Sequence, residues 1–277
     1  MIIHWAAGAA AICLTSILLV GPAEAAVPPP VELDRRCAAE LAPRVAPAHV
    51  LGCDPRGRGL AVVAFGDSGT APHVAVLVPG ADIDLARIAD PADPARRPAG
   101  WARALAETAG SDLAVVLWVG YVTPQGLSLD VATGWSARAG AAALVRFVDD
   151  LPVTGQLSVI GHSYGAVVVA LAAHDLPADD LVLLGSPGAR TDSVATMRTS
   201  ARVWAARATG DWIDRVPALR IGDLGHGADP TCPAFGARSL PVGGTEGHDG
   251  YFRPGSAALA GLAEVTLGRA PASGATR

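Results

Sequence analysis

The sequence of 277 residues contains no lysine and no asparagine, and each absence excludes a kind of chemistry. Without lysine there is no lysine nucleophile and no Schiff base, and without asparagine there is no acceptor for N-linked glycosylation. The 21 cationic side chains are all arginine and stand against 26 carboxylates, which gives a formal net charge of −5. This balance gives no reason to expect a nucleic-acid partner, and we predict none.

Metal-binding patterns are also missing from the sequence. The seven histidines form no pair at ligand spacing and the four cysteines are scattered, so we expect no metal site and no cofactor. Hydrophobic residues make up 51% of the chain and charged residues 17%. A chain of this length and composition can build one large α/β domain or two small ones.

The N-terminal 25 residues resemble an export signal. An uncharged apolar run covers Trp5 to Val20, Gly21-Pro22 interrupts it, and Ala23-Glu24-Ala25 matches a cleavage site. The residues before the run carry no lysine or arginine, so an uncleaved membrane anchor is the alternative. We predict a secreted or cell-envelope protein, with membrane association through this segment as the second interpretation.

Beyond the export signal, three further segments are predicted. Residues 26–44 form a linker or N-terminal segment that begins with a proline-rich stretch, residues 45–268 form the main domain, and residues 269–277 form a flexible tail. We expect the protein to be a monomer.

Three cysteines follow the predicted export signal. Cys37 and Cys53 lie sixteen residues apart and flank a predicted helical segment, and cysteines of exported proteins tend to pair. We therefore predict a Cys37–Cys53 disulfide, which leaves Cys232 without a partner. Three free, buried thiols are the alternative if the protein stays in the cytosol.

From residue 60 onward, apolar runs alternate with helical segments, which predicts a doubly wound, mostly parallel sheet. The predicted strands are Leu60–Phe65, His73–Val78, Leu113–Val119, Leu157–Ile160, Leu181–Leu184, Ala201–Ala206 and Ala237–Val242. The predicted helices are Asp84–Ile88, Gly100–Thr108, Ser136–Val148, Ala166–His174 and Ser256–Leu267.

One of these strand–helix junctions carries a G-x-S-x-G motif, Gly161-His162-Ser163-Tyr164-Gly165. Strand, sharp turn and helix are the context of a nucleophile elbow, in which the strained serine projects from the sheet edge and its neighbours need glycine. The Tyr164 N–H would then face a developing oxyanion from a helix N-terminus. The second donor is expected after the strand that ends at Val78, from the N–H of Ala81, with Gly80 as the next choice.

A serine hydroxyl needs a base, and the base needs an orienting carboxylate. In this arrangement the acid and then the histidine follow the serine along the chain. Asp211 comes just after a predicted strand and is our first choice for the acid, ahead of Asp214 and Asp229.

Two histidines could serve as the base. His248 lies in a glycine-rich loop after the last predicted strand and is our first choice, ahead of His226. His162 should point away from Ser163, because neighbouring side chains of a strand face opposite ways.

The segments VLVPGADIDL, LAVVLWVGYVTP, VIGHSYGAVVVALAA, LVLLGSPGA, ATGDWID, HGADP-x-x-PAFGA and EGHDGYF resemble the actinobacterial α/β-hydrolase family catalogued as domain of unknown function 1023. The resemblance covers roughly residues 45–268. It implies the α/β-hydrolase fold and a triad of Ser163, Asp211 and His248, but it implies no particular substrate. The chain departs from many members at Ala166, which replaces a serine.

Two other functions compete with a serine esterase. The first is an SGNH-type esterase that uses Ser68 of Gly66-Asp67-Ser68-Gly69, with Asp223-x-x-His226 as its last block. That chemistry uses an asparagine as oxyanion donor, and this chain has none. The second is a non-catalytic binding module on a hydrolase scaffold.

Only about fifteen residues separate the strand ending at Leu184 from the next one, which is too short for a helical cap domain. We therefore expect a minimal lid and a shallow, open cleft without interfacial activation, walled by Trp118–Gly134 and Ile221–Phe235. Its predicted apolar lining is Trp118, Tyr121 and Trp212, and its predicted substrate is a small-molecule or lipid-like ester.

Overall fold

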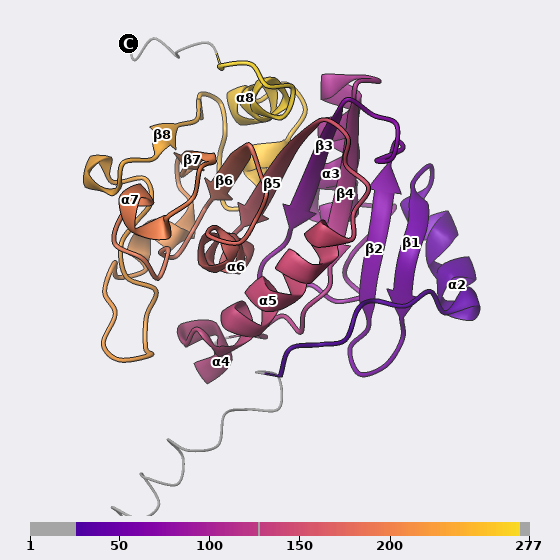
Figure 1. The fold of residues 1–277 in the computed structure, drawn as a ribbon, viewed down its shortest axis with the longest axis horizontal. Helices are drawn as coiled ribbons and strands as arrows, with labels where there is room; N and C mark the ends of the chain where they lie inside the picture. The colour runs from indigo at the N-terminus through magenta and orange to yellow at the C-terminus, as the bar shows by residue number, and fades with distance from the viewer. Residues whose placement is uncertain (1–25, 127, 272–277) are drawn as a thin grey trace, which may run out of the picture.

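The computed structural model describes residues 26–126 and 128–271 (Figure 1). The predicted export signal and most of the predicted tail therefore lie outside the described residues. Within the described part of the chain, no helix has the length and hydrophobicity needed to cross a membrane.

The centre of the molecule is one eight-stranded sheet with the order β1-β2-β4-β3-β5-β6-β7-β8. β2 runs antiparallel to both of its neighbours, and all the other strand pairs are parallel. The strands are β1 His49–Asp54, β2 Leu60–Phe65, β3 His73–Val78, β4 Leu113–Val119, β5 Gln156–His162, β6 Asp180–Leu184, β7 Arg202–Ala206 and β8 Arg238–Ser239. This is the predicted doubly wound, mostly parallel sheet of the α/β-hydrolase type.

Helices cover both faces of the sheet (Figure 1). α5 and α6 lie over one face, and α3 and α8 pack together on the other. The helices are α2 Arg35–Val45, α3 Pro98–Ala109, α4 Leu129–Ala132, α5 Trp135–Asp149, α6 Tyr164–Ala172, α7 Val194–Met197 and α8 Ala257–Thr266, with short 3-10 turns at Pro94–Arg96, Trp212–Arg215, Pro233–Phe235 and Gly250–Phe252.

Two hydrophobic cores result from this layering, one on each face. Along β3, Val76 packs toward α5 and α6, whereas the next residue, Leu77, packs toward α3 and α8. All seven residues of β4 are buried. A strand covered on both faces is expected to be apolar throughout, and that is the pattern from which it was predicted.

The predicted helix at Asp84–Ile88 is wrong, because this segment forms turns. The Asp84 side chain accepts hydrogen bonds from the N–H groups of Ala86 and Arg87, which closes a local turn in place of a helix. The prediction also missed β1, and β8 is shorter than expected.

The N-terminal segment is tied to the edge of the sheet. α2 buries Leu41 and Val45, and the backbone of residues 32–34 exchanges two hydrogen bonds with Cys53 on β1. Cys37 and Cys53 form the predicted disulfide, with 5.7 Å between their Cα atoms. Cys232 is free and exposed.

Candidate active site

Ser163 lies at the junction of β5 and α6 with φ 58° and ψ −127°, a strained conformation for a residue with a side chain. The flanking glycines are required by contact. A Cβ at Gly161 would lie 2.5 Å from Ala166 Cα, and one at Gly165 would lie 2.2 Å from the Val78 carbonyl oxygen. The motif therefore folds as the predicted nucleophile elbow.

The loop after β3 lies against this elbow. A Cβ at Gly80 would lie 2.7 Å from Ser163 Cβ and 2.9 Å from Tyr164 N, so only glycine permits the approach. Tyr164 is the first residue of α6, and its N–H therefore has no partner within the helix. Among the backbone hydrogen bonds of the described residues, none is donated by Ala81 N. The geometry thus leaves two backbone donors beside Ser163.

Asp211 and His248 are paired at the end of β7. The carboxylate accepts a hydrogen bond of 2.8 Å from His248 Nδ1, and this bond leaves Nε2 as the free acceptor of the ring. Asp211 also accepts bonds from the Tyr251 hydroxyl at 2.6 Å and from Ile213 N at 3.0 Å. Burial acts to raise the pKa of Asp211, but these bonds and the nearby imidazole outweigh it and hold the pKa below its usual range.

His248 is held by contacts with two rings and by its own backbone. Its ring centroid lies 4.8 Å from that of Trp212 and 4.7 Å from that of His162. His162 Nε2 donates a 2.7 Å hydrogen bond to the His248 carbonyl oxygen. Burial, followed by the charge of His248, lowers the pKa of His162 to about 3, so this ring is neutral. His162 is almost fully buried, which agrees with the prediction that its side chain points away from Ser163.

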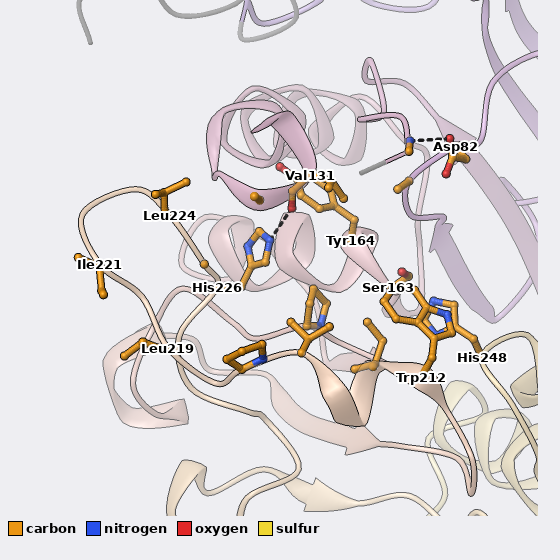
Figure 2. A pocket seen from close by; sticks show the side chains of 18 residues that line it. Asp82, Val131, Ser163, Tyr164, Trp212, Leu219, Ile221, Leu224, His226 and His248 are labelled. Atoms are coloured by element: carbon orange, nitrogen blue, oxygen red, sulfur yellow. Dashed lines mark hydrogen bonds between the residues drawn. The ribbon is translucent and has the colours of Figure 1, made fainter. Parts of the chain in front are cut away.

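Ser163 and His248 line the same cavity, and Figure 2 shows their side chains next to each other. In the part of the chain that the structure describes, no hydrogen bond joins the Ser163 hydroxyl to the imidazole. Such bonds are often long without substrate and tighten when substrate binds.

The rival carboxylates and the rival histidine are engaged elsewhere. Asp214 and Asp229 both pair with Arg207, at 3.5 and 2.8 Å. His226 Nε2 donates to the Val131 carbonyl oxygen at 2.8 Å, and its buried Nδ1 finds no hydrogen-bond partner among the described residues. His226 thus lacks the carboxylate partner that His248 has.

Ser68 is also misplaced for the alternative esterase. It follows β2, which is antiparallel to β4, with Phe65 opposite Val115 near the start of β4. The loop that carries Ser68 therefore lies at the N-terminal ends of the parallel strands, whereas Ser163 lies at their C-terminal ends.

A cavity of about 770 Å³ opens beside Ser163. The first predicted wall contributes Gly126, Val131 and Ala132, and the second contributes Ile221, Leu224, Gly225 and His226. A third segment also lines the cavity, through Trp212, Ile213, Val216, Pro217 and Leu219, and of these only Trp212 was predicted. In the connection between β6 and β7 the described residues hold only the four-residue α7, so no helical cap covers the site from there.

Two of the three predicted lining aromatics are misassigned. Trp118 and Tyr121 are buried and stack on each other at 5.9 Å, on the face covered by α5. Their side chains are needed in the core, and Tyr121 supports the loop after β3 by donating to the Pro79 carbonyl oxygen at 2.9 Å. Trp212 does line the cavity and is half exposed.

Three residues of the site were not found from the sequence. Tyr251 lies in the EGHDGYF motif, but nothing in the sequence near Tyr251 indicates that its hydroxyl bonds to Asp211. The bond from His162 to the His248 backbone is equally non-local. At Gly185 a Cβ would lie 2.9 Å from Asp211 Oδ2 and 3.2 Å from His248 Cε1, so the end of β6 must be glycine. The described residues contain no cluster of His, Cys, Asp or Glu arranged to hold a metal ion.

Solved structures with a similar fold include an α/β serine hydrolase without a lid from Xanthomonas campestris, with 19% identity, a TM-score of 0.45, and coverage of 82% of this chain and 97% of that one. Est1E from Butyrivibrio proteoclasticus has 12% identity and a TM-score of 0.47, with coverage of 80% and 98%. The esterase domain of a Rhodothermus marinus protein has 16% identity and a TM-score of 0.42, with coverage of 76% and 92%. Likeness at this level carries no conclusion about activity.

Two uncharacterised proteins from two strains of Mycobacterium tuberculosis are each 33% identical to this chain over 266 residues. The match covers 82% of this chain but only 40% of the length of those relatives. The family described as Alpha/beta hydrolase matches residues 54–221, which is more than half of the chain. The chain therefore belongs to the alpha/beta hydrolase family.

Proposed function

We propose that this protein is a serine hydrolase of carboxylic esters, with Ser163 as nucleophile, His248 as base and Asp211 as its orienting acid. One observation carries the proposal. His248, bonded to Asp211, lines the same largely apolar cavity as a serine on a strained elbow. A buried carboxylate that fixes Nδ1–H leaves Nε2 facing a hydroxyl, as a serine nucleophile requires.

The reaction follows from this geometry. His248 Nε2 takes the Ser163 proton while Oγ attacks the ester carbonyl carbon, and the oxyanion accepts hydrogen bonds from Tyr164 N and Ala81 N. The imidazolium, stabilised by Asp211, returns its proton to the departing alcohol, which leaves an acyl-serine. Water, deprotonated by the same imidazole, hydrolyses the acyl-serine and restores the enzyme.

The disulfide agrees with an oxidising compartment, and we propose that the protein works outside the cytoplasm. Assignment to the narrower family named from the sequence motifs stays a prediction.

The test compares three variants on p-nitrophenyl esters. Ser163→Ala and His248→Ala should each lower kcat on the order of 10⁴-fold. His174→Gln is the matched control, because His174 is exposed and does not line the cavity, and it should keep most of the activity. A fluorophosphonate probe should label the wild type and not Ser163→Ala. A folded wild type that neither turns over esters nor takes the label would instead be a binding module.

A further inference from the structure

The cavity beside Ser163 is lined at one end by an apolar turn, residues 219–224, whose backbone is firmly held. Leu219, Ile221 and Leu224 line it with side chains that are more than half exposed. Figure 2 shows these three residues at the end of the cavity farthest from His248. Isolated exposed apolar side chains need no explanation, but a group continuous with a cavity marks a ligand groove.

The exposure of these side chains is not the result of a loosely held backbone. Ile221 and Leu224 exchange backbone hydrogen bonds of 2.9 and 3.1 Å, which closes a tight turn. The nearly buried Arg190 donates to the carbonyl oxygen of Gly225 at 2.7 Å and pairs with the carboxylate of Asp223.

A second arginine reinforces the turn from the neighbouring helix. Arg138 of α5 donates two hydrogen bonds, of 2.8 and 3.0 Å, to the Asp223 carboxylate. The polar side of the turn is thus fixed to the body of the domain, and its apolar side faces the cavity and solvent.

The direction of the groove assigns the part of the ester that it takes. The departing alcohol must lie next to His248, because Nε2 gives it a proton. The acyl chain must then extend from Ser163 away from His248, and this is the direction of Leu219 and Ile221 in Figure 2. The lining of the cavity also includes aliphatic Val131 and Val216.

From this arrangement, and resting on the proposed function, we propose that the Leu219–Leu224 turn is the distal acyl-binding wall and that the substrates are esters of long-chain aliphatic acids. A bound chain would cover apolar surface that is now in water, which favours long acyl groups over acetate.

The kinetic test uses p-nitrophenyl acetate and p-nitrophenyl dodecanoate, the latter below its micellar limit. In wild type kcat/KM should be higher for dodecanoate. In Ile221→Ser the ratio of the two kcat/KM values should fall about tenfold, the expected effect of losing one buried aliphatic contact. Leu33→Ser is the control, since Leu33 is also more than half exposed but lies at the β1 edge of the sheet, and the ratio should stay unchanged.

A binding measurement separates this inference from the proposed function. Dodecanoate should bind Ser163→Ala in calorimetry, and the double variant with Ile221→Ser should bind it about tenfold more weakly. Equal binding by the two proteins would overturn the acyl wall while leaving the triad intact. Persistent turnover by Ser163→Ala would overturn the proposed function instead.

Two further outcomes would also refute the inference. The groove would take the alcohol if Ile221→Ser impaired hydrolysis of dodecyl acetate and not of the dodecanoate ester. The turn would be a docking surface for lipid if Ile221→Ser impaired only binding to phosphatidylcholine vesicles.

Discussion

The buried ring of His162 makes the stability of the fold depend on pH in a way that one substitution can isolate. Burial lowers the pKa of His162 to about 3, against 6.5 for an ordinary histidine. The unfolded chain therefore takes up a proton below about pH 6.5, and the folded chain does not until about pH 3. The stability that this site contributes is complete above pH 6.5 and is lost as the pH falls toward 3.

The size of the effect follows from these two values. Between pH 7 and pH 5, proton uptake by the unfolded state alone lowers the free energy of unfolding by about 2 kcal/mol. His162→Gln can still donate to the His248 carbonyl oxygen but takes up no proton, so this part of the pH dependence should vanish.

The assay is urea unfolding of wild type and His162→Gln at pH 7 and pH 5. The wild type should lose about 2 kcal/mol more than the variant between the two pH values. Burial also lowers the pKa of His226, but that contribution is present in both proteins and cancels. Equal losses in wild type and variant would refute the reasoning, because they would mean that His162 is protonated alike in both states.

Three further predictions concern single contacts. Tyr251→Phe removes the 2.6 Å bond to the Asp211 carboxylate, so it should lower the free energy of unfolding by about 1–3 kcal/mol in urea and lower kcat for esters. An unchanged kcat would contradict an orienting role for Tyr251. Gly165→Ala puts a Cβ 2.2 Å from a carbonyl oxygen and should lower the free energy of unfolding in urea by more than about 3 kcal/mol. Gly243→Ala is its control, because the added Cβ has no atom closer than 3.9 Å, and it should change that free energy by less than about 0.5 kcal/mol. Replacing Cys37 and Cys53 together by serine should lower the free energy of unfolding by about 3 kcal/mol. An unchanged urea midpoint would contradict this, because it would mean that the disulfide does not stabilise the fold by constraining the unfolded chain.

The sequence predicted the parts of the molecule that leave a local signal. Central strands such as β4 are continuous apolar runs, and the elbow at Ser163 needs glycines at fixed spacing. Asp211 and His248 were reached by chain order and loop position, and the structure brings these two together. Their catalytic role stays a proposal until it is tested.

The features that were missed depend on contacts between distant segments. The bond from His162 to the His248 carbonyl oxygen joins residues 86 positions apart, and nothing near either residue signals it. The strand β1 contains a histidine, a glycine and an aspartate, so its apolar pattern is weak. Trp118 was assigned to the cleft because it begins the predicted wall Trp118–Gly134, but its side chain packs in the core on the face covered by α5.

Both edges of the sheet are protected against pairing with further strands, which bears on how the protein behaves at high concentration. On one edge, residues 32–34 occupy hydrogen-bonding groups of β1 and are held there by the disulfide-linked α2. On the other edge, β8 has two residues, and Arg238 lies over the Trp204 ring. Unpaired strand edges invite association with other chains. Reducing the disulfide would therefore do more than lower stability, because it would free one edge of the sheet to recruit strands and promote aggregation.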